Sequence, residues 1–361
     1  MRAARHFTWV FCLLSAPSIM PQEIGSGLDL RASITAQAVG SSELTDRPRS
    51  GAPVVAGARA IGYPTIKFND HFFMTGAVQV VTRPYYYADL SSVGYGAKGQ
   101  VLQATLNYSR VGQNGSILLR AGEMSSAFGS FLLRYDDADN ALVDVPPGYG
   151  YYSPVSLSAV TGAQIDATRG KWDGRIQFAN SSPANPRSPF ANDQYGNWVG
   201  GAGYTVRQGF RVGASAYSGP YLDRSYPYFF PGERNPSKLR AHGLGLDGAW
   251  EHGHTRIFME ANTFELPYTV VPSFRESAGY AEIREVLSPR WFVAGRLGLT
   301  RSNIPVRRCS FETSAGFRPN RLQLLKIGYE LEHYTFGSRR DTNTFALQYI
   351  TILHKSAAWR Q

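Results

Sequence analysis

The sequence has little cysteine, little charge and, after its first 20 residues, no long apolar run. Two cysteines among 361 residues exclude a disulfide framework, and 18% of the residues are charged. No stretch after residue 20 is long and apolar enough for a helical membrane span, which takes about 20 residues. The formal net charge is +10, but no lysine and arginine run of the kind that binds nucleic acid is present. We therefore expect no nucleic-acid partner.

Residues 1–20 are typical of a secretory signal peptide. Arg2 and Arg5 form a basic start, and residues 7–20 form a mostly apolar segment that is too short for a membrane helix. We expect residues 21–361 to form the mature domain, with Cys309 as its single cysteine. An N-terminal core strand is the alternative interpretation. An exported chain without disulfides needs another source of stability, and a closed hydrogen-bonded barrel is one.

Aromatic residues and glycine are abundant, with 21 Tyr, 20 Phe and 37 Gly. Polar and apolar residues alternate in segments of about 10 to 14 residues, the length of a tilted strand that crosses a bilayer. One example is the run 102–109, in which Gln103, Thr105 and Asn107 alternate with apolar neighbours. Sheets of soluble sandwiches alternate in the same way, so the pattern alone indicates an all-β fold.

About sixteen segments carry this alternation, which is the strand number of a barrel with a water-filled lumen. The predicted strands are residues 28–39, 53–68, 71–83, 98–109, 114–123, 156–169, 171–181, 195–207, 209–218, 239–252, 254–264, 275–287, 290–302, 307–318, 321–335 and 341–354. Pro64 falls inside the second strand and is tolerated there only near a bulge or bend.

The connections alternate between tight turns and longer links. Tight turns are predicted at 69–70, 112–114, 170, 208–209, 253, 288–289 and 319–320. The links between them are long at 40–52, 84–97, 124–155, 182–194, 219–238 and 265–274, and short near 304 and 338. This layout is typical of a transmembrane antiparallel β-barrel with short periplasmic turns and longer extracellular loops.

The longest link, 124–155, is the third of the long ones, and its position and length resemble those of the third loop of porins. The stretch with Arg120, Gly122, Phe128 and Gly129 is similar to a short motif of the phosphate-selective porin group. The resemblance implies a loop that folds into the barrel and narrows it, and a homotrimer.

If the loop folds inward, its charged residues face arginines of the wall and create a field across the pore. The loop candidates are Arg134, Asp136, Asp137, Asp139 and Asp144. The wall candidates are Arg59, Lys67, Arg120, Arg175, Arg211, Arg256, Arg296 and Arg308, with Asp166, Asp247, Glu260, Glu312, Glu330 and Glu332 as counter-charges. Basic side chains slightly outnumber acidic ones on the wall, which favours a weak anion preference. An ordinary solvated acidic loop is the alternative.

Aromatic residues near the predicted strand ends suit the girdles that lie at membrane interfaces. The candidates are Tyr85, Tyr86, Tyr87, Trp172, Trp198, Trp250 and Trp291. The chain departs from most outer-membrane barrels at its end, because residues 355–361 follow the last predicted strand, whereas such barrels commonly end on an aromatic residue.

Catalytic and metal-binding patterns are scarce. No Gly-x-Ser-x-Gly elbow is present, and His252 and His254 flank a predicted turn at Gly253 without a nearby third metal ligand. We therefore expect no enzyme activity, no cofactor and no metal. The sequence predicts a passive channel in the outer membrane that contacts outer-membrane lipid and passes small hydrophilic solutes or anions. The alternatives are an exported soluble all-β binding protein and an outer-membrane barrel that acts as an adhesin or enzyme.

Overall fold

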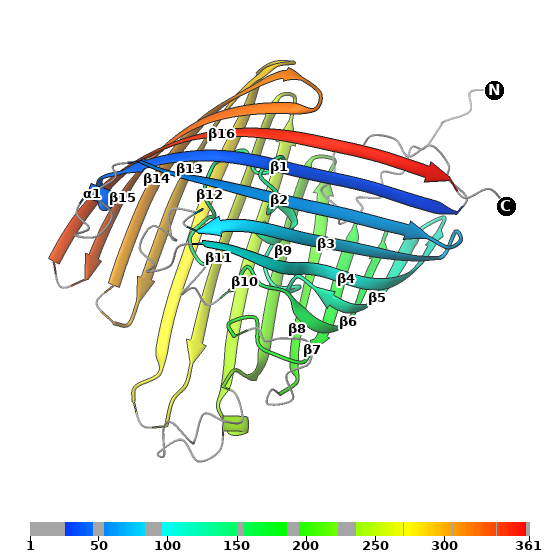
Figure 1. Ribbon diagram of the computed structural model, residues 1–361. Coiled ribbons are helices and arrows are strands. Elements are labelled where there is room, and N and C mark those ends of the chain that lie inside the picture. Colours follow the sequence, from blue (N-terminus) through cyan, green and yellow to red (C-terminus); the bar gives the residue numbers. More distant parts are fainter. Residues whose placement is uncertain are drawn as a thin grey trace.

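The computed structural model describes residues 26–45, 54–83, 85, 96–149, 155–185, 195–222, 236–269, 271–304, 306–336 and 338–358. It is a closed barrel in which every strand pairs with its neighbours in sequence and β16 pairs with β1 (Figure 1). The strands are β1 (Gly27–Ser41), β2 (Val54–Lys67), β3 (Phe72–Arg83), β4 (Gly96–Gly112), β5 (Gly115–Met124), β6 (Val160–Arg169), β7 (Trp172–Ala179), β8 (Asn197–Arg207), β9 (Phe210–Pro220), β10 (Arg240–His252), β11 (Thr255–Leu266), β12 (Phe274–Ser288), β13 (Trp291–Ser302), β14 (Val306–Asn320), β15 (Gln323–Phe336) and β16 (Ser338–Ala358). Short helices lie at α1 (Ser42–Thr45), η1 (Phe131–Arg134) and η2 (Pro236–Lys238).

The prediction of a sixteen-stranded antiparallel barrel is confirmed. The tight turns and the longer links also alternate as predicted, with short links between β13 and β14 and between β15 and β16. The predicted signal peptide, residues 1–20, lies outside the described residues.

Closure depends on the pairing of the first and last strands. β1 and β16 are paired antiparallel over the full length of β1, from Gly27 opposite Ala358 to Ser41 opposite Thr344. Lipid offers no hydrogen-bond partner to a free strand edge, so a membrane-spanning sheet has to close on itself.

The outer wall of the barrel is apolar. Large apolar side chains alternate outward along the strands and remain exposed, for example Leu246 at 66%, Leu299 at 62% and Ile327 at 63%. A band of this kind around the whole molecule would be strongly unfavourable in water. The alternative of an exported soluble protein is therefore wrong. No helix among the described residues is long and apolar enough to cross a membrane.

Aromatic pairs lie at both ends of the β7–β8 hairpin. The ring centroids of Trp172 and Tyr204 are 4.7 Å apart, at the end where short turns join β6 to β7 and β8 to β9. Those of Phe178 and Trp198 are 4.9 Å apart, at the opposite end, where the long loop joins β7 to β8. Such rings mark the two interfaces of a membrane. Trp291 is half exposed beside Phe317 at another turn.

Tyr85 does not belong to a girdle, contrary to the prediction. Its side chain is 1% exposed, and its hydroxyl donates a hydrogen bond of 2.8 Å to Asp137 inside the barrel. Tyr85 follows the end of β3, where the strand parity that orients side chains no longer applies. Tyr86 and Tyr87 lie outside the described residues.

Pro64 lies in β2 beside an irregular part of the sheet, as predicted. The β2–β3 pairing is interrupted between Gly62 and Thr65, and the β3–β4 register shifts between Ala77 and Val78. Proline has no N–H for the sheet ladder, so this interruption accommodates it.

We expect a charge on the outer wall to destabilise the barrel. Ile34 lies near the middle of β1 and is 46% exposed, so the variant Ile34→Arg places a guanidinium toward lipid at a cost of about 2–4 kcal/mol. Unfolding by denaturant in lipid bilayers measures the free energy. The control is Thr65→Arg on the inner face of β2, which should cost much less. Equal losses for both variants would contradict the assignment of the two faces.

Candidate pore constriction

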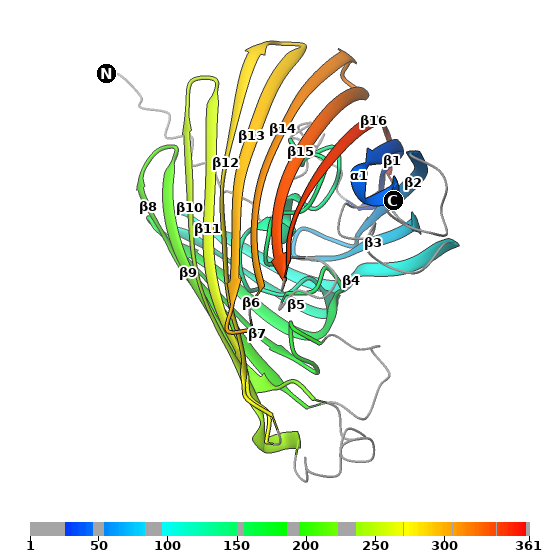
Figure 2. The ribbon, with the colours of Figure 1, turned by 90° about the vertical axis from the view of Figure 1, so that its left-hand side faces the viewer.

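The loop between β5 and β6 lies inside the barrel. Figure 2 shows the path of this loop relative to the strands. Residues 125–149 contact inward-facing side chains on both sides of the lumen, from β1, β2, β7, β9 and β11 to β15. Apolar contacts contribute as well. Phe128 and Phe131 pack with Tyr217 and Phe264 of the wall, while Leu142 packs with Ile350. The loop therefore forms a packed body within the lumen and is not a solvated surface loop.

The sequence motif at residues 120–129 directs the chain inward. Arg120 pairs with Asp166 of the neighbouring strand at 2.5 Å, and Phe128 is fully buried. Gly129 has a φ of +72°, and a Cβ at this position would lie 1.9 Å from Tyr149 Oη and 2.4 Å from Glu260 Oε1. Only glycine combines this backbone conformation with so close an approach. The motif thus has a structural role at the start of the loop.

Glu260 of β11 and Glu282 of β12 anchor the first part of the loop. The backbone N–H and the hydroxyl of Ser130 donate to Glu260 Oε2 at 3.1 and 2.9 Å. Arg134 donates to Glu282 and to the Tyr280 hydroxyl, both at 2.9 Å. Glu260, Tyr280 and Glu282 all point into the barrel. Arg134 of the loop supplies the positive charge that pairs with the Glu282 carboxylate.

The next loop residues bind the β1–β2 wall. Asp136 accepts hydrogen bonds from Ser33 at 2.9 Å and from Tyr63 at 2.6 Å. Asp137 has three partners, which are Thr35 at 2.9 Å, Tyr85 at 2.8 Å and Arg59 at 3.4 Å. These carboxylates are therefore tied to the wall behind them, so Asp136 and Asp137 do not stand free across an open pore.

Lys326 of β15 holds the middle of the loop. Its ammonium donates hydrogen bonds to the carbonyl oxygens of Asp137, Asn140 and Leu142 at 2.9, 3.1 and 2.9 Å. An ammonium has three donors, so these carbonyls use all of them.

Glu312 of β14 holds the last part of the loop. Its Oε1 accepts the backbone N–H groups of Val143 and Asp144 at 2.8 and 3.0 Å. Arg296 lies beside it, bonded to Glu312 and, at 2.9 Å, to the carbonyl oxygen of Asp144. The Asp144 carboxyl is fully buried, with Oδ1 lacking a hydrogen-bond partner within the described structure. Burial, and next Glu312, raise its pKa to about 7.

Three arginines gather around Asp139 on the side of the short turns. Arg31 lies 3.7 Å from the Asp139 carboxylate, Arg318 donates to the Ala138 carbonyl oxygen at 3.4 Å, and Arg284 lies nearby with its guanidinium over the Phe292 ring. Burial raises the pKa of Asp139 to about 7, and Asp136 adds to this effect, while the three arginines oppose it. The cluster carries an excess of positive charge.

The remaining wall candidates pair along the inner face. Arg175 donates to the Gly129 carbonyl oxygen at 2.5 Å, and Arg211 bridges Asp173 and Asp247 at 2.6 Å each. Arg308 pairs with Glu332 at 2.7 Å. Two candidates lie near the turns and away from the loop, namely Lys67 paired with Asp70 and Arg256 paired with Glu251.

Sequence reasoning did not single out several residues that hold or face the loop. They are Arg31, Tyr63, Glu282, Arg284, Arg318 and Lys326. Strand parity could have found them, because each lies an even number of residues from another inward side chain of its strand. Lys326, for example, shares the inner face of β15 with the candidates Glu330 and Glu332.

Metal coordination finds no support in the part of the chain that the structure describes. No group of three or more His, Cys, Asp or Glu there is placed to hold a metal ion. His252 and His254 lie at the β10–β11 turn.

Comparison with known proteins identifies the fold. No protein-family model matches the chain, and no curated protein sequence does. Solved structures do match. The anion-selective porin from Comamonas acidovorans has a TM-score of 0.63 at 8% identity, over 91% of this chain and 100% of that one. The outer membrane channel DcaP of Acinetobacter baumannii has a TM-score of 0.62 at 11% identity, over 91% and 98%.

The fold is that of the outer-membrane porins. OprB of Pseudomonas putida, with a TM-score of 0.62 at 9% identity over 91% of this chain and 94% of that one, agrees. Together with the apolar outer wall, the porin fold places the chain in the outer membrane, as predicted. The resemblance to the phosphate-selective porin group remains a prediction.

Loss of the Lys326 ammonium should loosen the loop. The variant Lys326→Met leaves three buried carbonyl groups without their donor, at a cost of about 1–3 kcal/mol for each group that finds no other partner. We expect faster hydrogen exchange in residues 136–145 and noisier single-channel currents. Lys171→Met is the matched control, because Lys171 is exposed at a turn and bonds to Val206. Unchanged exchange in Lys326→Met would contradict the anchoring role.

Proposed function

We propose that the protein is a passive diffusion channel for small hydrophilic solutes and ions, with a weak preference for anions. The observation that carries the proposal is the docking of residues 125–149 inside a barrel whose inner face is polar. A polar wall keeps the lumen hydrated, and a fixed loop limits the size of the solutes that pass. We also propose that residues 1–20 are removed on export and that the protein assembles into a trimer. The solved "trimer form" of OmpT from Vibrio cholerae, at 11% identity, supports the trimer.

The arginine cluster supports the anion preference. Arg31, Arg284 and Arg318 lie around one carboxylate of the loop, that of Asp139. Nε of Arg31 and Nε of Arg284 are buried without a hydrogen-bond partner among the described residues, and Nη2 of Arg31 has the ion pair with Asp139 at 3.7 Å but no hydrogen bond there. Donors that are not saturated by protein groups favour anions over cations in their vicinity. The anion-selective porin from Comamonas acidovorans is a structural neighbour with the same fold.

Planar-bilayer recording tests the proposal directly. We expect stable single-channel steps and, in a potassium chloride gradient, a reversal potential displaced toward that of chloride. Double substitution of Arg284 and Arg318 by glutamine should move the reversal potential toward potassium. A folded protein that gives no steps would contradict the channel function and favour a barrel used for adhesion or catalysis. Steps with a reversal toward potassium would contradict only the anion preference.

The pKa of Asp139 predicts a pH-dependent selectivity. With a pKa of about 7, the carboxyl is neutral below pH 7 and negative above it, so the anion preference should increase as the pH falls from 8 to 6. A unit charge about 10 Å from a permeating ion contributes about 0.4–1.7 kcal/mol for effective dielectric constants of about 80 to 20. The charge acts with opposite signs on chloride and on potassium, so the two contributions add, and the permeability ratio of chloride to potassium should rise by about threefold or more between pH 8 and pH 6.

Two variants distinguish the source of this pH dependence. Asp139→Asn should keep the acid value of the ratio at every pH, because the neutral amide cannot ionise. Asp144→Asn should leave the pH step in place, since Asp144 is 1% exposed and lies apart from the arginine cluster, beside Arg296 and Glu312, although its pKa is also about 7. A pH step that survives in Asp139→Asn would assign the titration to another group.

A further inference from the structure

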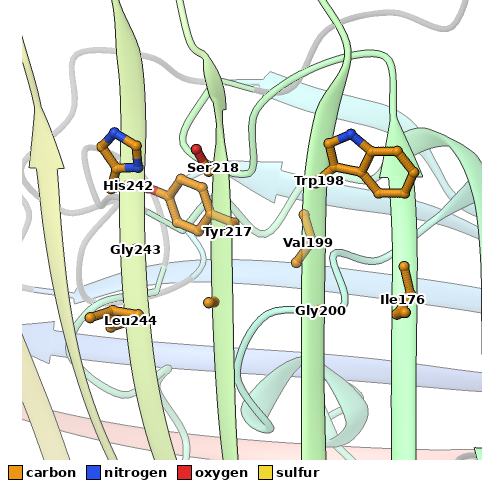
Figure 3. A pocket seen from close by; sticks show the side chains of 10 residues that line it. Ile176, Trp198, Val199, Gly200, Tyr217, Ser218, His242, Gly243 and Leu244 are labelled. Carbon is orange, nitrogen blue, oxygen red and sulfur yellow. The ribbon is translucent and has the colours of Figure 1, made fainter.

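A groove of about 550 Å³ lies on the outer wall of the barrel, over β7 to β10. Trp198 and Ile176 stand on one side of it, and His242 and Leu244 stand on the other (Figure 3). Gly200, Ala216 and Ser218 form its floor. The lining is almost entirely apolar, as expected for a surface that meets lipid.

The size of the side chains across neighbouring strands creates the groove. The register places Ile176, Gly200, Ala216 and Leu244 in one row across the four strands. The outer residues of this row are large, and the two central ones have almost no side chain. The next row toward the loops repeats the order, with Phe178 and Trp198 on one side, Ser218 in the centre and His242 on the other side. The groove therefore runs along the strands and not around the barrel.

The upper end of the groove lies at the membrane interface. Trp198 and Phe178 form the aromatic pair at the loop end of the β7–β8 hairpin, so the row that contains His242 lies at the level of the outer girdle. Arg240 follows on the same outward face of β10, two residues closer to the loop, and is exposed. Lys238, also exposed, precedes it in η2. Basic groups thus stand where lipid headgroups begin.

We propose that this groove binds one phosphate-bearing glycolipid of the outer leaflet, with an acyl chain along Gly200 and Ala216 and a phosphate at Arg240 and His242. The shape fits a chain, because the depression runs along the strands and has large side chains on both sides. The charge fits a phosphate, since arginine pairs with phosphate oxygens through two parallel hydrogen bonds. This site is separate from the lumen and does not depend on the proposed channel function.

A second copy of the chain fits the groove less well. A stable protein interface buries about 800 Å² on each partner between surfaces of complementary shape. A barrel wall is convex and would bridge the groove without filling it. Empty space in an apolar contact loses the dispersion energy of the atoms that are missing.

Native mass spectrometry of the full protein in detergent tests the proposal. After delipidation, the protein is titrated with diphosphorylated lipid A and with its dephosphorylated form. We expect one equivalent of the phosphorylated lipid to bind, and affinity about tenfold lower for the dephosphorylated form, as for the loss of one charge-assisted contact. Ala216→Leu, which fills the floor, and Arg240→Gln should each lower the affinity by about tenfold.

Matched controls carry the same chemical changes elsewhere on the outer wall. Ala60→Leu alters an exposed alanine of β2, and Arg301→Gln alters an exposed arginine at the loop end of β13. Both should bind like the wild type, and unchanged mobility of unheated protein on gels checks that every variant folds. Equal binding by Ala216→Leu and Ala60→Leu would overturn the proposal, and so would equal binding of the two lipids. A change of oligomeric state specific to Ala216→Leu would also overturn it and assign the groove to a second copy.

Discussion

The structure depends on the hydrogen bonds between β1 and β16. In water, an open sheet edge can bond to solvent, but in lipid each free N–H or C=O group would cost several kcal/mol. The pairing from Gly27 to Ser41 removes both edges at once. Because closure fixes which face of every strand points inward, it also sorts the side chains. Leu246 faces lipid, while its neighbour Asp247 faces the lumen and pairs with Arg211.

The lumen behaves as a second interior. Residues 125–149 bury Phe128, Phe131 and Leu142 against the inner wall, and carboxylates or ammonium groups of the wall bind the loop backbone. Apolar contact and charged hydrogen bonds act together here, as they do in the core of a soluble protein. The arginines around Asp139 are the exception, because Arg31 and Arg284 have buried donors with no hydrogen-bond partner in the part of the chain that the structure describes.

The strands could be predicted because a period of two is a local property of the sequence. Neighbouring residues such as Phe311 and Glu312 show it directly, and the alternation of short and long links gave the orientation of the loops. The same alternation predicts that the side chains of Arg59, Glu260 and Glu312 point into the lumen, where the structure has them. The alternation of inward and outward side chains stops where a strand stops. Tyr85 lies beyond the end of β3, so the alternation does not predict that its side chain points into the barrel.

The contacts of the loop could not be predicted from the sequence. Lys326 meets carbonyl groups that lie more than 180 residues earlier in the chain, and Asp136 meets Ser33 about 100 residues away. Neither partner carries a local signal of the other, since each contact depends on the path that the loop takes across the barrel. The groove over β7 to β10 depends in the same way on the register between four strands, although each of its residues is unremarkable in its own strand.

The anchoring of the loop also constrains the order in which the protein is built. Residues 136–144 leave the ribosome well before β13, β14 and β15, yet their final partners are Arg296, Glu312 and Lys326 of those strands. During the interval the carbonyl groups of the loop have no such partners, so the loop reaches its native position only after the last quarter of the chain has joined the sheet. Closure of the barrel and docking of the loop are therefore coupled events, because the strands that complete the sheet also carry the groups that bind the loop.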